Sequence, residues 1–270
     1  TRKDAHKLVE EYMLLSNREV ALRMFQASEN TGGAFLYRIH DQPVIEKLDN
    51  LVTLVRALGY HLPVTKKGVA VKDLKNLFKQ VEGKTEESLI KTAAVRSMAK
   101  AVYSTQNIGH YGLAFEYYTH FTSPIRRYAD LIVHRLLHRE LTNGKVARGE
   151  MSKYQKIAED NSEKEVRAAE AERASIKYKQ VEYMMDRIGQ EFNGTISGVS
   201  EWGIYVEDKE TKCEGMVRLK DMTDDYYSFN EKAYCVVGEK TGKKYSLGDS
   251  VKFKVMGADM EKRTLDYKLI

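Results

Sequence analysis

The chain has 270 residues, and 44 lysine and arginine residues against 39 aspartate and glutamate residues give it a formal net charge of +5. It is 42% hydrophobic and 31% charged, with a mean hydropathy of −0.52, which is typical of a globular protein and argues against a disordered one. No run approaches the roughly 18 apolar residues that a membrane-spanning helix requires, and we recognise no signal-peptide pattern, so we expect a cytoplasmic protein without membrane contact. Residues 191–270 hold 13 basic and 15 acidic residues, so a polyanion-binding surface is expected to be local and mainly within residues 1–190.

The chain contains two cysteines, Cys213 and Cys235. Two isolated thiols do not supply the ligands of a structural zinc site, and a lone disulfide is not expected in a reducing compartment. We therefore interpret both cysteines as ordinary residues.

Hydrophobic periodicity predicts a mainly helical first part of the chain. A helical pattern covers residues 6–25, and its apolar face contains Leu8, Val9, Tyr12, Met13, Val20 and Met24. Because this pattern is already complete at the first residue, we expect that a segment upstream has been removed. The next predicted elements are an extended piece at 33–38, a turn at 41–43, a helix over 48–58 that ends at Gly59, a helix over 85–103 and a tight turn at 109–112.

The second part of the chain changes from helical to strand patterns. Residues 151–187 are rich in Glu, Lys, Arg and Ala, which predicts one long solvated helix that joins or braces two domains. Strand-like segments with glycine-bearing turns follow at 191–199, 202–207, 214–219, 249–259 and 263–269, and five such strands predict a small OB-type barrel. The expected fold class is α+β, with a mainly helical domain at 1–188, its long helix at 151–188, and a barrel domain at 189–270.

The stretch from Tyr118 to Arg139, YTHFTSPIRRYADLIVHRLLHR, carries the strongest chemical signal. Thr122 and Ser123 are favourable N-cap residues and Pro124 suits the first helical position, so we expect a helix to begin here. Its apolar stripe would contain Ile125, Tyr128, Ala129, Ile132, Val133 and Leu136.

The start of this expected helix is a candidate phosphate-binding site. Free N–H groups at a helix N-terminus attract anions, and a guanidinium group grips two oxygens of one phosphate. We therefore select Arg126 and Arg127 as candidate phosphate ligands, and Ser123 as a further candidate substrate-binding residue. The alternative is a surface helix whose arginines meet only solvent or a carboxylate.

Asp130, His134 and Glu10 are three further candidate residues. Arg126, Asp130 and His134 are spaced to share a helix face, on which Asp130 would hold Arg126 in place. For Asp130 and His134 we prefer an ordinary surface network. Glu10 is a candidate contact to a sugar or base of the substrate, and a solvated helix glutamate is its alternative.

The barrel segment contains an acidic cluster and several aromatic residues. Asp221, Asp224 and Asp225 are spaced like ligands of a hard cation, but acidic residues are common in turns, which is the interpretation we prefer. Trp202 and Tyr205 are candidate substrate-binding residues, because exposed aromatics on an OB barrel stack bases; alternatively, both fill the core of a small barrel. Tyr226, Tyr227 and Phe229 are further aromatic positions.

These segments resemble a known family. GHYGLAFEYYTHFTSPIRRYADLIVHR resembles the closing motif of the catalytic domain in the bacterial exoribonuclease II/R family, and RKDAHKLVEEYMLLSN, FLYRIHDQP and KAVYSTQNIGHYG resemble the preceding blocks in order. EFNGTISGV, WGIYVE, DDYYSF, YSLGD and LDYKLI are similar to the S1 domain that follows in that family. The resemblance spans essentially the whole chain. Within the family, the sequences HFTSPIRRY and DDYYSF favour the exoribonuclease R branch.

The resemblance implies processive 3′→5′ hydrolysis of single-stranded RNA to nucleoside 5′-monophosphates, with Mg²⁺ as the expected metal of the intact enzyme. The family's metal ligands lie in an S-x-D-x-x-D-x-D-D-like motif, which this chain does not contain, so we expect the fragment to be inactive alone. By position, Arg126 matches the family's active-site arginine, which contacts the phosphate near the scissile bond, so the resemblance implies that Arg126 is the catalytic residue. Glu10 matches a glutamate that contacts the 3′-terminal nucleotide.

Two other classes of function stay open. The chain is alternatively a stand-alone S1-type RNA-binding module without catalysis, or its long charged helix is a surface for a partner protein. The expected partner is single-stranded RNA, with the ribosome or RNA-decay proteins as further candidates. We expect a monomer.

Overall fold

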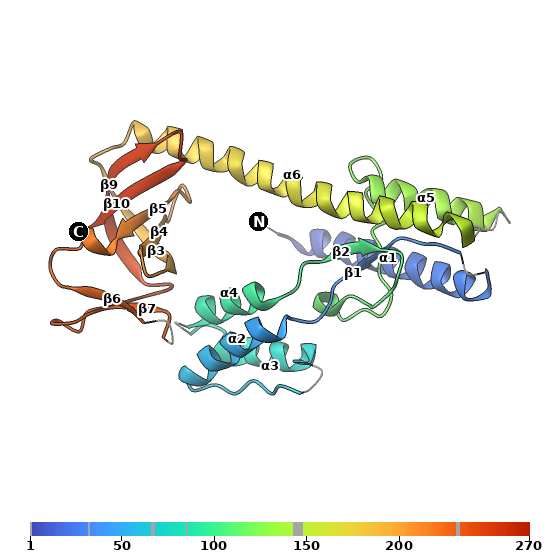
Figure 1. The fold of residues 1–270 in the computed structure, drawn as a ribbon, viewed down its shortest axis with the longest axis horizontal. Coiled ribbons are helices and arrows are strands. Elements are labelled where there is room, and N and C mark those ends of the chain that lie inside the picture. The colour runs from blue at the N-terminus through green and yellow to red at the C-terminus, as the bar shows by residue number, and fades with distance from the viewer. Residues whose placement is uncertain (1, 32, 66–67, 85, 143–147, 231–232) are drawn as a thin grey trace. The chain divides into compact units, whose positions relative to one another are not determined.

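The computed structural model describes residues 2–31, 33–65, 68–84, 86–142, 148–230 and 233–270 (Figure 1). These residues form two compact units, of which the first comprises 1–43 and 98–169 and the second 44–97 and 170–270. The predicted long charged helix is confirmed as α6 (Met151–Met185), which contributes residues to both units. The α+β fold class is confirmed as well.

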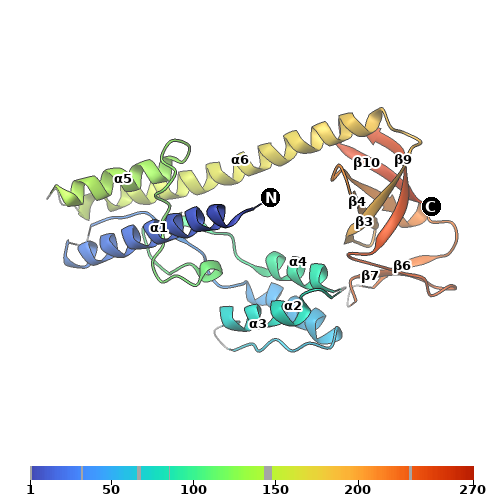
Figure 2. The same cartoon turned by 180° about the vertical axis from the view of Figure 1, so that it is seen from behind.

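The first unit is built around two helices and a short pair of strands. Its elements are α1 (Asp4–Thr31), β1 (Tyr37–Ile39), β2 (Val102–Ser104), the 3-10 helix η1 (Tyr111–Leu113), α5 (Tyr128–Leu141) and the 3-10 helix η2 (Arg148–Glu150). Within this unit, α1 and α5 lie side by side in both views (Figures 1 and 2). Their shared core includes Ala21 and Met24 of α1, Ile132 and Leu136 of α5, and Ala158 of α6.

The apolar face predicted for the first helix is buried only in its second half. Leu8, Val9 and Tyr12 are 58%, 59% and 62% exposed, whereas Ala21 and Met24 are buried. The core that α1 shares with α5 therefore begins only near the middle of the helix. The first three of these residues form an exposed apolar surface instead.

The second unit begins with three helices, α2 (Ile45–Ala57), α3 (Val71–Val81) and α4 (Glu87–Ser97). The helix predicted over 48–58 is confirmed, and Gly59 has the positive φ of +83° expected after its end. We did not predict α3, which buries Leu74, Leu77 and Val81. The helix predicted over 85–103 is shorter than expected, because Val102–Ser104 pair instead with β1 of the first unit's sheet.

The predicted five-stranded barrel is confirmed. It consists of β3 (Glu191–Val199), β4 (Gly203–Asp208), β5 (Glu214–Arg218), β9 (Ser250–Asp259) and β10 (Thr264–Leu269), in the closed order β10-β5-β4-β3-β9. All contacts between neighbours are antiparallel except for β10 with β5, which closes the barrel in parallel at Asp266 and Met216. The barrel core includes Ile204, Val206, Phe253 and Tyr267, and α6 adds Val181 and Met184.

A second sheet lies within the barrel segment and was not predicted. The 3-10 helix η3 (Leu219–Asp221) is followed by β6 (Tyr227–Asn230), β7 (Cys235–Gly238) and β8 (Lys244–Ser246), which form a three-stranded antiparallel sheet. Cys213 and Cys235 are both free and buried, as expected for ordinary residues. No helix within the described ranges is long and apolar enough to cross a membrane.

Candidate nucleic-acid interface

The candidate phosphate-binding motif forms a turn before α5, not the first turn of the helix. The backbone N–H groups of Arg126 and Arg127 both donate to the carbonyl oxygen of Ser123, at 3.3 and 3.1 Å. Arg127 has an extended backbone with φ −118° and ψ 115°, so α5 begins only at Tyr128. Pro124 therefore occupies the second position of a turn, where its restricted φ is also favourable.

The predicted apolar stripe is correct only from Ala129 onward. Ala129, Ile132, Val133 and Leu136 are buried, but Ile125 is completely exposed and Tyr128 is 51% exposed. Ile125 precedes α5, so it does not share a helix face with Ala129, Ile132 and Leu136.

Asp130 closes this turn from inside the protein. Its side chain is fully buried, and Oδ2 accepts hydrogen bonds from the Ser123 N–H and from Nη2 of Arg127, both at 2.8 Å. Our preferred interpretation of Asp130 as part of a surface network is therefore wrong, and Asp130 holds Arg127 rather than Arg126. Because the Ser123 N–H is already bonded, it is not a free donor for a phosphate.

Buried polar atoms gather around this ion pair. Oδ1 of Asp130, Nε of Arg127 and Oγ1 of Thr122 are buried without a hydrogen-bond partner among the described residues. His134 is half-buried: its Nε2 lies 2.8 Å from the carbonyl oxygen of Phe121, and its ring stacks on the Phe121 ring at 4.0 Å. The segment before α5 is thus anchored at both Phe121 and Ser123.

Arg126 is the arginine that this arrangement leaves available. Its side chain is exposed and forms no ion pair within the described part of the chain. Arg127, in contrast, is committed to Asp130, with only 23% of its side chain exposed. The turn therefore separates two adjacent arginines into one that stabilises the fold and one that faces solvent.

Two histidines with lowered pKa values and an arginine lie in the same unit as the turn, and our sequence reasoning did not select them. Burial is the main cause that lowers the pKa of His120 to about 3, followed by the nearby charges of Arg127 and Arg38. Burial also lowers the pKa of His110 to about 4, with His40 and Arg38 as further causes. Both imidazoles are therefore uncharged at neutral pH.

Arg38 is held rigidly beside these histidines. Its guanidinium donates to both carboxylate oxygens of Glu165, at 2.6 and 3.1 Å, and lies 4.7 Å from the centre of the Tyr103 ring. Tyr103 in turn has its hydroxyl 2.8 Å from Nδ1 of His120. FLYRIHDQP contains this arginine, but only the fold brings it near residues 103, 120 and 165.

Glu10 lies on the exposed part of α1. Its carboxylate pairs with Arg2, and within the described residues no contact joins it to Arg126. Glu10 and Arg126 belong to the same unit. The role of Glu10 as a substrate contact stays a prediction.

On the barrel, the aromatic candidates face outward. Trp202 is 70% exposed, and Tyr205 alternates along β4 with the core residues Ile204 and Val206. The alternative in which both residues fill the barrel core is therefore wrong. Their role in binding RNA stays a prediction.

The aspartates of the DMTDDYY segment serve as turn and side-chain acceptors. Asp225 accepts hydrogen bonds from backbone and side-chain donors, and Asp224 accepts one from the Tyr227 hydroxyl at 3.0 Å. Across the ranges that the structure describes, no group of three or more His, Cys, Asp or Glu side chains is arranged to hold a metal ion. These residues do not fit the Mg²⁺ that the family resemblance implies.

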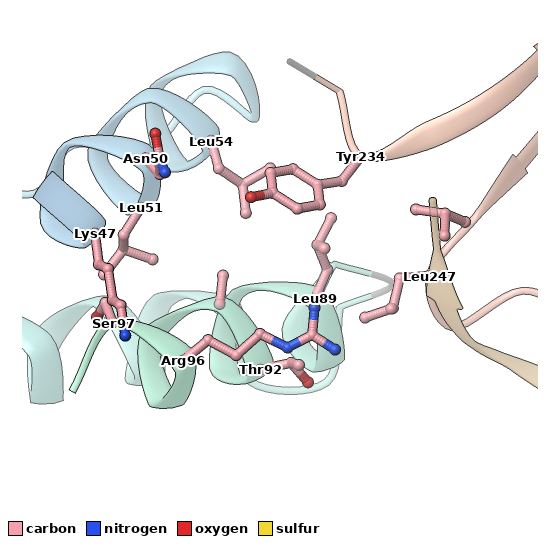
Figure 3. A pocket seen from close by; sticks show the side chains of 12 residues that line it. Lys47, Asn50, Leu51, Leu54, Leu89, Thr92, Arg96, Ser97, Tyr234 and Leu247 are labelled. Atoms are coloured by element: carbon pink, nitrogen blue, oxygen red, sulfur yellow. The ribbon is translucent and has the colours of Figure 1, made fainter. Parts of the chain in front are cut away.

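A separate pocket lies in the second unit, between α2, α4 and the β-rich segment (Figure 3). It has a volume of about 220 Å³, and Leu54, Leu89, Tyr234 and Leu247 form its apolar part. None of the predicted site residues lines it, so we do not include it in the candidate interface.

Comparisons with known proteins agree with both parts of the chain. The RNB domain model matches residues 1–143, and the S1 RNA binding domain model matches residues 185–268. Ribonuclease R of Aquifex aeolicus is 40% identical over 267 residues, which cover 98% of this chain and 37% of that protein. Ribonuclease R of Escherichia coli is 34% identical over 279 residues, which cover 100% of this chain and 34% of that protein.

A solved structure has the same fold. Mycoplasma genitalium RNase R in complex with ribose methylated single-stranded RNA matches with a TM-score of 0.86 and 27% identity, covering 100% of this chain and 42% of that one. The chain thus spans between a third and a half of the length of these relatives. It belongs to the RNB-domain family that includes the ribonuclease R proteins, and it carries an S1 RNA binding domain after its RNB region.

Proposed function

We propose that this chain is part of a processive 3′→5′ exoribonuclease that hydrolyses single-stranded RNA to nucleoside 5′-monophosphates. In this proposal residues 1–188 belong to the catalytic domain and residues 189–270 are the S1 domain. The RNB match over 1–143 and the RNA complex of the Mycoplasma relative support it. The observation that carries it is the exposed Arg126 on a turn locked by the buried Asp130.

Arg126 is the residue that contacts the substrate in this proposal. Its guanidinium group pairs with two oxygens of one backbone phosphate and steadies that phosphate during hydrolysis. Asp130 keeps Arg127 from competing for the same phosphate, because it accepts a hydrogen bond from the Arg127 side chain. Glu10 contacts the sugar or base of the 3′-terminal nucleotide.

Mg²⁺ is the metal that we propose for the intact enzyme, where it would activate water and stabilise the leaving oxygen. The described residues offer no ligand set for it, so we expect this chain alone to release no nucleotide. The check is a purified chain incubated with oligouridylate and Mg²⁺, followed by chromatography of the products. Release of uridine 5′-monophosphate would overturn the expected inactivity.

RNA binding tests the proposal directly. The chain should bind a short oligouridylate at low salt, and the affinity should fall steeply as salt rises, because bound phosphates release counterions. Arg126→Ala should weaken this binding. Arg135→Ala is the matched control, since Arg135 is also exposed and lies on the adjoining helix α5.

A stand-alone RNA-binding module is the second candidate, and the exposed Trp202 on the barrel favours it. This alternative predicts binding that depends on Trp202 and is indifferent to Arg126→Ala. Loss of affinity in both variants supports the exonuclease proposal, and loss only in Trp202→Ala supports the module. Unchanged affinity in both variants contradicts both.

We also propose a cytoplasmic location and a monomeric state, with partners beyond RNA among the ribosome or RNA-decay proteins. The monomer is checked by light scattering of the purified chain. A concentration-independent mass of twice the chain mass of 31.0 kDa would contradict it.

A further inference from the structure

Asn17 is a polar residue of α1 whose side chain is buried, with only 4% exposed. Counted from Asp4, where the helix begins, it is the first buried residue of α1. A buried amide is stable only where its donor and acceptor find partners, because it has lost its hydration. The partners of Asn17 therefore show which part of the fold it holds.

Both partners of Asn17 lie in the segment 118–121, which leads into the turn that carries Arg126. Its Nδ2 donates to the Tyr118 hydroxyl at 3.1 Å, and its Oδ1 accepts from the Phe121 N–H at 3.0 Å. One amide thus bonds a side chain at the start of this segment and the backbone at its end. Asn17 therefore ties α1 to the segment before the turn.

The same segment is held by two other elements. The Tyr118 carbonyl oxygen accepts from the N–H of Arg38 in β1 at 2.9 Å. The Phe121 carbonyl oxygen lies 2.8 Å from Nε2 of His134 in α5. The segment is thus a fixed part of the first unit, to which Asn17 attaches α1.

Glu10 lies on the same face of α1 as Asn17. The two residues are seven positions apart, which corresponds to roughly 10 Å along the helix axis. Glu10 belongs to the exposed half of the helix, before the first buried position at Asn17. Because the hydrogen bonds of a helix connect each turn to the next, the position of Asn17 determines where Glu10 lies.

Apolar packing alone defines the rotation of α1 about its axis less closely. Ala21 and Met24 are buried in the core that α1 shares with α5, and the attraction between apolar groups is non-directional. The two hydrogen bonds of Asn17 require particular distances and angles. They therefore fix the rotation of the helix at the first buried position after Glu10.

We propose that Asn17 is a positioning residue, which aligns the helix that carries Glu10 with the turn that carries Arg126. This inference rests on the proposed function, in which Arg126 binds a backbone phosphate and Glu10 binds the 3′-terminal nucleotide. Asn17 is buried and acts through these two residues. It keeps their side chains at a separation that one RNA chain spans, so that each contact strengthens the other.

A double-mutant cycle on RNA binding tests this role. A short 5′-labelled oligouridylate with a free 3′-hydroxyl group is titrated at low salt, and fluorescence anisotropy gives the affinity. The cycle compares the unaltered chain with Glu10→Gln, Arg126→Ala and the double variant. Because the two contacts depend on each other, the double variant should bind roughly three-fold or more tightly than the product of the single losses predicts.

The cycle is then repeated in two variants of Asn17. Asn17→Leu removes both hydrogen bonds at similar volume, so the coupling between Glu10 and Arg126 should disappear. Asn17→Asp keeps an acceptor for the Phe121 N–H and accepts from the Tyr118 hydroxyl instead of donating to it, so the coupling should be retained. A role in stability alone would leave the coupling intact in both variants as long as they fold.

Asn161→Leu is the matched control and should leave the coupling unchanged. Asn161 is half-buried on α6, and its Nδ2 donates to the Ile157 carbonyl oxygen of the same helix. Tyr118→Phe is a milder variant that removes one of the two Asn17 bonds and keeps the ring, so it should reduce the coupling even if Asn17→Leu does not fold. Thermal unfolding by circular dichroism verifies the fold of each variant.

The cycle distinguishes failure of this role from failure of the proposed function. Unchanged affinity in both Glu10→Gln and Arg126→Ala would overturn the proposed function. Weaker binding in either single variant, without coupling in the unaltered chain or with the same coupling in Asn17→Leu and Tyr118→Phe, would overturn the positioning role of Asn17 alone.

Discussion

Asp130 and Arg127 form an ion pair at 2.8 Å in which the carboxylate is fully buried. The same oxygen of Asp130 accepts the Ser123 N–H, so one side chain joins both ends of the turn that presents Arg126. The exposed arginine depends on its buried neighbours for its position. This relationship leads to the first prediction.

Replacing Asp130 should destabilise the first unit. Asp130→Ala leaves the partly buried guanidinium of Arg127 and the Ser123 N–H without their acceptor, and loss of one partner of a buried pair costs about 3 kcal/mol. Urea unfolding followed by circular dichroism measures this loss. Asp160→Ala, at an exposed position on α6, is the control and should leave the midpoint unchanged. Equal midpoints for the two variants would refute the role of Asp130.

The stability of the chain should decrease as the pH falls below about 6.5. His120 has a pKa of about 3 in the folded state against a usual value of 6.5, so between these values only the unfolded state binds the proton. Stability therefore rises with pH across this window, by up to about 1.4 kcal/mol per pH unit for each such histidine. Urea midpoints measured at pH 7 and pH 5 test this dependence.

The matched variants for this pH dependence are His120→Asn and His138→Asn. The asparagine at 120 keeps an acceptor for the Tyr103 hydroxyl but does not titrate, so the slope should become smaller. His138 is exposed on α5, and its replacement is the matched control for a histidine-to-asparagine change as such. An identical slope in His120→Asn would mean that His120 is not a source of the effect.

Adding a single methyl group at Gly215 should disturb the barrel core. A Cβ atom there would lie 2.5 Å from Cε2 of Tyr267, which is buried and whose hydroxyl donates to the Cys213 carbonyl oxygen. Gly215→Ala should therefore destabilise the barrel by about 1–3 kcal/mol through overpacking. Gly257→Ala is the control, because its nearest atom is 3.9 Å away. If thermal unfolding shows equal losses of stability for Gly215→Ala and Gly257→Ala, close packing at Gly215 is not the cause of the destabilisation.

Replacing Arg38 by lysine should destabilise the first unit although the charge is kept. Lysine cannot donate to both oxygens of Glu165 and stack on Tyr103 in the same way, so we expect a loss of about 1–2 kcal/mol. Arg23→Lys is the comparison, because Arg23 also bonds both oxygens of a glutamate, Glu140, but its side chain is 55% exposed. Urea unfolding measures the stability of both variants. A larger loss of stability in Arg23→Lys than in Arg38→Lys would contradict this expectation.

Long periodic elements could be predicted from the sequence because their patterns are local. The charged helix over 151–187 and all five barrel strands appear in the structure close to their predicted positions. The helix α3 was missed although Leu74, Leu77 and Val81 have helical spacing, so a signal for it was present. The strands β6, β7 and β8 are only three or four residues long, too short for alternation to identify them.

Local patterns were enough to predict the long charged helix, the five barrel strands and the motif that contains Arg126, because periodicity, turn residues and motif spacing are properties of neighbouring residues. The burial of Asp130, its pairing with Arg127 and the exposure of Arg126 follow from tertiary packing. Burial and charge pairing depend on residues that are distant along the chain. For that reason the motif alone offered both arginines as phosphate ligands and linked Asp130 to Arg126, whereas packing pairs Asp130 with Arg127 and leaves Arg126 exposed.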